Sequence, residues 1–149
     1  MLKILLALHL LFAVFAIGPL VHAATTAARG VRTGDAGAMK SSARLLRIYA
    51  IASVLVVAVG FPLASTKSPS THKEIAQFSD TWIWLSLLLW AVAVALVLAV
   101  LVPGLRSATA ALERQEPIAK FTARIAAAGG VVGLIFAGII FLMVYRPGN

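Results

Sequence analysis

Histidine is the residue type in this chain best suited to hold a metal ion or a haem, and the sequence contains three of them: His9, His22 and His72. His9 lies about six residues inside the first apolar segment, so about 9 Å below the membrane edge at ~1.5 Å per residue. An ionisable side chain at that depth needs a polar partner and is a functional candidate by default. Neutral imidazole is also a common ligand of transition metals. His9 is therefore a candidate ligand of haem b or copper, and its alternative interpretation is a neutral, hydrogen-bonded packing residue.

A second ligand at the same depth is not evident in the sequence. His22 falls at the far end of the first apolar segment, and His72 falls in a polar loop. Ser86 and Trp90 of the third segment lie one turn apart at a depth comparable with that of His9, and Gly138 of the fourth leaves room for a ring. We expect His9 to point into a helix bundle toward these groups.

The sequence lacks the residues that other common kinds of functional site require. The chain has no cysteine, which removes disulfides and thiolate metal sites. The apolar segments contain no Asp, Glu, Lys or Arg, so a proton-coupled carrier would lack its proton-carrying group. There is no Ser/His/Asp set and no glycine-rich phosphate loop, and no basic stripe is interleaved with aromatic residues. We therefore expect no enzymatic activity and no binding of nucleic acid.

The elements that position these residues follow from composition. Hydrophobic residues make up 61% of the 149 residues and charged residues 12%, with a mean hydropathy of +0.98. A bilayer-spanning helix needs roughly 20 apolar residues, and about 17 is the lower limit. Four segments meet this requirement, at about 4–21, 48–64, 82–102 and 125–145. We predict an all-α, four-helix transmembrane bundle with up-down-up-down topology, in a single domain over residues 1–149.

The first segment also has features of a secretory signal, because Val21-His22-Ala23 at its end could pass as a small-residue cleavage site. Its apolar run is longer than the usual 7–15 residues of a signal peptide. Cleavage after Ala23 would also leave a strongly basic loop to be translocated, against the positive-inside rule. We predict that the segment is retained as the first span.

Charge predicts the orientation. The formal net charge is +8. Most of the 13 Lys and Arg residues lie in the first and third connections, so they flank the spans on one side of the membrane. That end carries Arg29, Arg32, Lys40, Arg44, Arg47, Arg106, Arg114, Lys120 and Arg124. Because the more basic side of a membrane protein faces the cytoplasm, we place loops 23–47 and 104–124 in the cytoplasm. Both termini then lie outside the plasma membrane.

Residues at the ends of the spans are expected to contact the membrane interfaces. We assign Arg44, Arg47, Arg106 and Arg124 to the cytoplasmic interface, where they can attract anionic lipid. Trp82 and Trp84 are assigned to the outer interface, because indole rings settle at headgroup depth. The lipid bilayer is thus the one predicted partner that composition supports directly.

The connections between spans contain recognisable turn and capping residues. On the basic side we expect Gly34–Gly37 to form the turn between two long helices, with Asp35 as an N-cap. Pro117 suits the first turn of the fourth helix, and Pro103 should kink the third. In the outer loop we expect a short helix over 72–78.

The fourth span carries small residues spaced for close helix packing. Gly129 and Gly133 form a Gly-x-x-x-Gly motif, and Ala137 extends the stripe by one more turn. The stripe predicts the face on which another helix lies closest. That helix could be span one or three of the same chain, or a second copy across a dimer interface.

A family resemblance covers nearly the whole chain. Leu8–Leu11, Gly18–Leu20 and the basic run Arg44–Arg47 resemble the four-span predicted membrane proteins of domain of unknown function 2269. The wider set is similar to copper-resistance D-type proteins and to the four-span, haem-containing protoporphyrinogen oxidase, which also place a His early in span one. This resemblance implies a haem or copper role for His9. The chain has Phe15–Ile17 where those relatives carry a Trp before the glycine, and it lacks the oxidase's intramembrane lysine.

These observations predict a small scaffold or accessory subunit of a membrane complex, or a homo-oligomer, without catalysis. The alternative hypothesis is a haem- or copper-binding membrane protein that uses His9. A small transporter ranks third, because the spans lack a charged or strongly polar lining.

Overall fold

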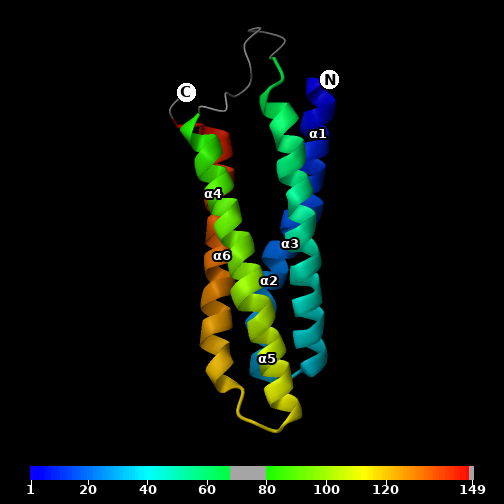
Figure 1. Cartoon of the computed structure of the whole chain (residues 1–149), viewed down its shortest axis with the longest axis vertical. Helices are drawn as coiled ribbons and strands as arrows, with labels where there is room; N and C mark the ends of the chain where they lie inside the picture. Colours follow the sequence, from blue (N-terminus) through cyan, green and yellow to red (C-terminus); the bar gives the residue numbers. More distant parts are fainter. Residues whose placement is uncertain (68–79, 148–149) are drawn as a thin grey trace.

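The computed structural model describes residues 1–67 and 80–147. The first and third membrane segments are each built from two α-helices joined by a short π-helical stretch, and the second and fourth are single α-helices (Figure 1). In chain order the elements are α1 (Leu2–Phe12), η1 (Ala13–Ile17), α2 (Gly18–Thr33), α3 (Ala36–Ala64), α4 (Thr81–Leu96), η2 (Val97–Leu101), α5 (Val102–Glu113) and α6 (Ala119–Tyr145). The short helix expected over 72–78 lies outside the described residues.

Four of the resulting continuous helices are long and apolar enough to cross a membrane. This confirms the predicted all-α fold with four spans. Both termini lie at one end of the bundle, here called the terminal end (Figure 1). The opposite end, which holds residues 34–35 and 114–118, is called the hairpin end. Because α2, α3 and α5 continue well past the apolar segments, two helical hairpins form there as predicted.

The turn between α2 and α3 is built by two residues. Gly34 has φ +62°, a left-handed conformation that glycine adopts without strain, and it ends α2. The Asp35 carboxylate accepts a hydrogen bond of 2.9 Å from the backbone N–H of Ala38, which confirms Asp35 as the N-cap of α3. At the other hairpin the prediction for Pro117 was wrong by two residues. The first residue of α6 is Ala119, so Pro117 precedes the cap instead of occupying the first turn.

The two π-helical stretches share one cause. Each is followed immediately by a short proline-containing sequence, Gly18-Pro19 after η1 and Val102-Pro103 after η2. Proline lacks a backbone N–H and its ring collides with the carbonyl four residues earlier, a conflict that a widened preceding turn relieves. The interruption expected near Pro103 therefore begins at Val97. The equivalent interruption before Pro19 was missed, although the same residue signals it.

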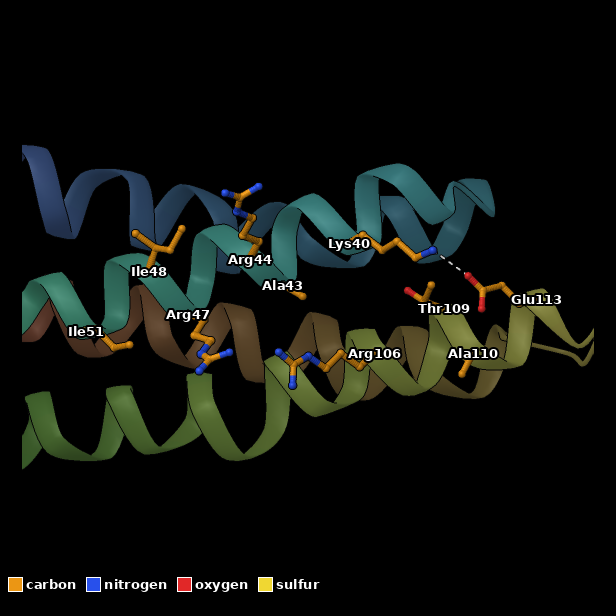
Figure 2. Close-up of a pocket in the computed structure, with 10 residues that line it drawn as sticks. All are labelled: Lys40, Ala43, Arg44, Arg47, Ile48, Ile51, Arg106, Thr109, Ala110 and Glu113. Atoms are coloured by element: carbon orange, nitrogen blue, oxygen red, sulfur yellow. Dashed lines mark hydrogen bonds and ion pairs between the residues drawn. The ribbon is translucent and has the colours of Figure 1, made fainter.

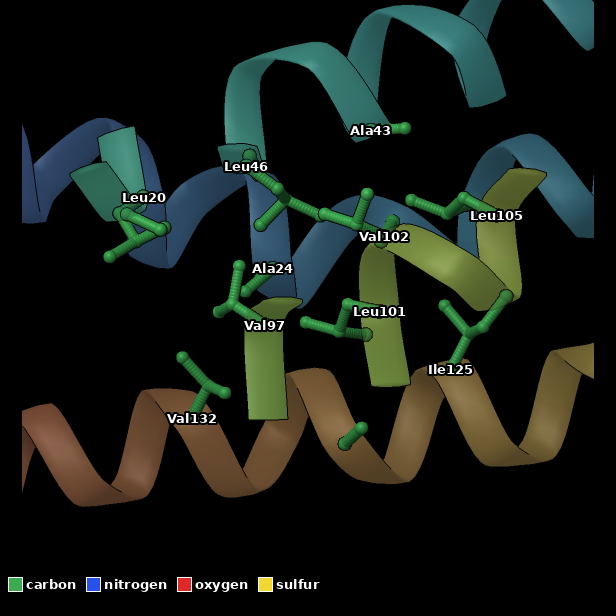
Figure 3. Close-up of a cluster of buried hydrophobic side chains, with 14 of the residues drawn as sticks. Leu20, Ala24, Ala43, Leu46, Val97, Leu101, Val102, Leu105, Ile125 and Val132 are labelled. Atoms are coloured by element: carbon green, nitrogen blue, oxygen red, sulfur yellow. The ribbon is translucent and has the colours of Figure 1, made fainter. Parts of the chain in front are cut away.

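The core lies toward the hairpin end, and α2 is its centre. Along one side of α2 every residue that faces the bundle is small or branched: Leu20, Ala23, Ala24, Ala27, Ala28 and Val31 are all buried. The side chains of Leu46, Leu101, Ile125 and Val132 pack around them from the other spans (Figure 3). Because alanine has so little side chain, the neighbouring helices can approach the α2 backbone closely.

The closest approach in the bundle is between α2 and α6. A Cβ added at Gly129 would overlap the backbone carbonyl oxygen of Ala24, and one added at Gly133 would lie 3.2 Å from Thr25 Cγ2. The Gly-x-x-x-Gly face thus contacts the first span of its own chain. Ala137 does not share the contact and is exposed. The reason is that the first span parts from α6 at Gly18-Pro19: α2 packs against both α6 and α3, whereas α1 packs against α3 and makes little contact with α6.

The terminal half of the bundle consists of two helix pairs, α1 with α3 and α4 with α6. The pairs diverge toward the terminal end (Figure 1). None of the residues of α1, all of which the structure describes, is buried. Packing in this half is consequently much looser than around α2.

Gly129→Ala should destabilise the protein strongly, because the new methyl group meets backbone and cannot be relieved by a side-chain rotation. Overpacking of this kind costs about 1–3 kcal/mol or more. Thermal unfolding in detergent should show a clearly lowered Tm.

The matched control is Gly130→Ala, the same change at the next residue, where an added Cβ has nothing within 4 Å among the described residues. It should leave the Tm nearly unchanged. Equal effects of the two substitutions would contradict the α2–α6 contact.

Candidate functional site

His9 lies on the side of α1 that faces α3. Its Nδ1 is 3.1 Å from the backbone carbonyl oxygen of Val56, and the side chain is half-buried. A Cβ at Gly60 would lie 3.3 Å from His9 Cε1, so the missing side chain of this glycine makes room for the imidazole. The histidine is therefore held in a small notch on the second span.

The neighbours predicted for His9 were wrong. Ser86, Trp90 and Gly138 belong to the other helix pair, α4 with α6, and α1 packs on α3 instead. Depth along the membrane normal was a poor guide because it does not tell which helix lies beside the first. Gly60 is the signal that could have been used, since it removes a side chain from the second span at a comparable depth.

The contact with Val56 fixes which nitrogen of His9 carries the proton. A carbonyl oxygen can only accept, so Nδ1–H must be the donor and Nε2 keeps its lone pair. This is the arrangement found in metal-binding histidines, where the other ring nitrogen is held by a hydrogen bond. Within residues 1–67 and 80–147, no group of three or more His, Cys, Asp or Glu side chains is placed to bind a metal ion.

A second polar contact joins the two helix pairs. Trp90 Nε1–H donates to Ser53 Oγ at 3.0 Å, and Ser53 Oγ donates to the carbonyl oxygen of Ala50 at 2.7 Å. Ser53 is completely buried, and its hydroxyl is satisfied by the backbone of its own helix. The Trp90–Ser53 hydrogen bond ties α4 to α3, which otherwise make little direct contact.

The two tryptophans assigned to the outer interface differ. Trp84 is 60% exposed, whereas Trp82 is buried and the Arg146 guanidinium lies over its ring at 5.6 Å from the centroid. Two residues in sequence turn about 200° around a helix, so the two side chains must face opposite ways. Trp82 therefore packs in the bundle. Within the described chain, its Nε1 and the Oγ of Ser86 are buried without a hydrogen-bond partner.

The basic interface residues also separate in space. Arg44, Arg47 and Arg106 line a groove between α3 and α5 near the hairpin end (Figure 2). Arg124 is exposed on α6 and does not line that groove. Sequence reasoning grouped the four by their position at span ends and gave no indication that three of them share one surface.

Comparison with known proteins identifies the chain at the level of family. A family model described as predicted integral membrane protein, DUF2269, matches residues 3–147. The chain belongs to the DUF2269 family. This confirms the resemblance found in the sequence, and a four-span DUF2269 protein is what the helices describe. Neither the curated proteins nor the solved structures contain a match. The similarity to copper-resistance and haem-containing oxidase families stays a prediction.

Proposed function

We propose that this protein is a scaffold or accessory subunit of a membrane complex, built without catalytic machinery of its own. The observation that carries the proposal is the packing of α1. This helix forms 11 of the 32 residues of the first continuous helix, and none of its residues is buried within the chain. In lipid there is no hydrophobic force to hold helices together, so association depends on close packing between them. A helix that packs so little on its own chain has most of its surface available to another protein.

The half-buried residues of α1 lie on a single stripe toward α3, at Leu2, Leu5, His9 and Phe12. The opposite side carries large apolar residues, among them Leu11, 50% exposed, and Phe15 in η1, 66% exposed. This side is the surface that we propose for a partner helix, from another subunit or from a second copy of the chain.

The test is purification of the full-length chain in a mild detergent, followed by mass determination of the particle. We expect a complex heavier than the 15.6-kDa monomer. The variant Leu11→Ala/Phe15→Ala should release the monomer, because it removes bulk from the proposed contact surface. Its matched control, Leu134→Ala/Phe141→Ala, removes the same two residue types from exposed positions on α6 and should leave the complex intact. A monomeric wild-type protein, or equal loss in both variants, would contradict the proposal.

We also propose that the hairpin end faces the cytoplasm and that the membrane is the plasma membrane. Nine of the 13 Lys and Arg residues lie at or near that end, as the positive-inside rule requires.

The natural absence of cysteine allows a direct measurement of this orientation. In intact cells an impermeant maleimide should label Lys67→Cys at the terminal end and should not label Thr33→Cys at the hairpin end. Both side chains replaced are exposed at their own ends. Labelling of Thr33→Cys alone would show that the hairpin end faces the exterior, against the proposed orientation.

A second candidate function is binding of haem b or copper through His9. The free lone pair on Nε2, with Nδ1–H held by Val56, favours it. If it holds, the purified protein should show a Soret band or bound copper that His9→Ala loses and His22→Ala keeps. A colourless, copper-free preparation from cells supplied with haem and copper would exclude this candidate.

A further inference from the structure

The groove between α3 and α5 is lined by one stripe from each helix (Figure 2). Its volume is about 560 Å³. The stripe on α3 consists of residues that recur at intervals of three and four: Lys40, Ala43, Arg44, Arg47, Ile48 and Ile51. The stripe on α5 does the same with Arg106, Thr109, Ala110 and Glu113. Small residues in both stripes leave the space that forms the groove.

The polarity of the lining changes along the bundle axis. Ile48 and Ile51 lie within the second apolar span, and Arg47 directly precedes it. At the other end of the groove, Lys40 Nζ and Glu113 Oε1 form an ion pair of 2.7 Å (Figure 2). A molecule that filled the groove would therefore meet hydrocarbon side chains at one end and charged groups at the other.

Two guanidinium groups stand at the boundary between these environments. Arg47 from α3 and Arg106 from α5 extend toward one another across the groove, while Arg44 points away from α5 (Figure 2). Like charges that converge in this way repel, and the repulsion grows where the surroundings are less polar than water. An anion between them would relieve it.

The chain does not supply that anion from the part that the structure describes. Of the acidic residues at the hairpin end, Asp35 caps α3, Glu113 pairs with Lys40 and Glu116 pairs with Arg114 at 2.9 Å. The hydrogen bond from Arg114 lowers the pKa of Glu116, so this carboxylate stays ionised and engaged at neutral pH. Neither Arg47 nor Arg106 has a carboxylate partner within residues 1–67 and 80–147.

We propose that this groove binds an anionic glycerophospholipid, with the headgroup phosphate between Arg47 and Arg106 and an acyl chain along Ile48 and Ile51. Guanidinium groups bind phosphate oxygens in bidentate fashion, and basic pockets between membrane helices suit anionic headgroups. A soluble anion would satisfy the two arginines and leave the apolar end of the groove unused. An amphiphile matches both ends, and Arg47 directly precedes an apolar span, which is the position expected of a residue that contacts lipid phosphates. The proposal does not depend on the accessory role proposed above.

The experiment is native mass spectrometry of the full-length chain in a mild detergent, with phosphatidylglycerol or phosphatidylcholine of identical acyl chains. We expect phosphatidylglycerol to bind at lower concentration than phosphatidylcholine. Arg47→Gln/Arg106→Gln should weaken phosphatidylglycerol binding by about tenfold or more, since hydrogen bonds to charged groups are lost. Phosphatidylcholine should lose less, because its phosphate is also anionic but its choline cation is repelled by the two guanidinium groups in the wild-type protein. Equal binding of the two lipids by the wild-type protein would overturn the proposal.

The matched control is Arg29→Gln/Arg32→Gln. It removes the same charge from the same end of the bundle, at two exposed arginines on α2 that do not line the groove. It should keep phosphatidylglycerol binding within about twofold of the wild-type value. An equal loss in this variant would show that diffuse positive charge attracts the lipid, and it would overturn the proposed site.

A competition measurement separates a lipid from a free phosphate. Glycerol 3-phosphate carries the phosphate without acyl chains and should not displace phosphatidylglycerol at equal concentration. Displacement as effective as by intact lipid would mean that the groove binds a soluble anion, against the proposal.

A last measurement needs no variant and so does not depend on the folding of one. Phosphatidylglycerol with a photoreactive diazirine in its acyl chain should label the wild-type chain mainly at 48–51. Labelling concentrated on α6 instead would place the lipid elsewhere and overturn the assignment.

Discussion

The structure depends on one constraint, the close approach of two backbones where α6 crosses α2. Gly129 has no side chain, and the carbonyl of Ala24 occupies the space where one would stand. Water does not drive helices together in a bilayer, so contacts of this kind must supply much of the attraction. The alanine-rich stripe of α2 extends the contact in both directions, and the remaining spans pack around it. The well-packed half of the molecule is the half that contains this crossing.

The proline at position 19 determines where that packing stops. From Pro19 toward the hairpin end, the first span is a helix of small residues in the centre of the bundle. From Pro19 toward the terminal end, the same span is an outer helix that packs on α3. The widened turn of η1 lies where the first span parts from α6 while it stays against α3. The helices α1 and α2, which form one continuous apolar run at their junction in the sequence, thus have different roles in the structure. The helix α2 packs at the centre of the fold, and the helix α1 carries His9 and a broad apolar surface.

The fold was predictable because it depends on local properties of the sequence, such as the length of each apolar run and the residues at helix ends. Apolar length predicts the spans, and the Asp35 cap follows from local chemistry. The arrangement of helices around one another was not predictable in the same way. His9 was placed beside the wrong helices, and Trp82 was grouped with Trp84 at the outer membrane interface although their spacing puts the two rings on opposite sides of α4. The convergence of Arg47 and Arg106 depends on two helices far apart in sequence, so neither segment alone could reveal it.

The crossing of α2 and α6 also has a consequence for biogenesis. Its two partners are contributed by the first and the fourth membrane segments, and the second and third are synthesised between them. While the ribosome is still producing the middle spans, the alanine face of α2 has no glycine surface to meet and must be shielded by lipid or by the insertion machinery. The crossing of α2 and α6 can therefore form only after α6 has been synthesised and inserted into the bilayer.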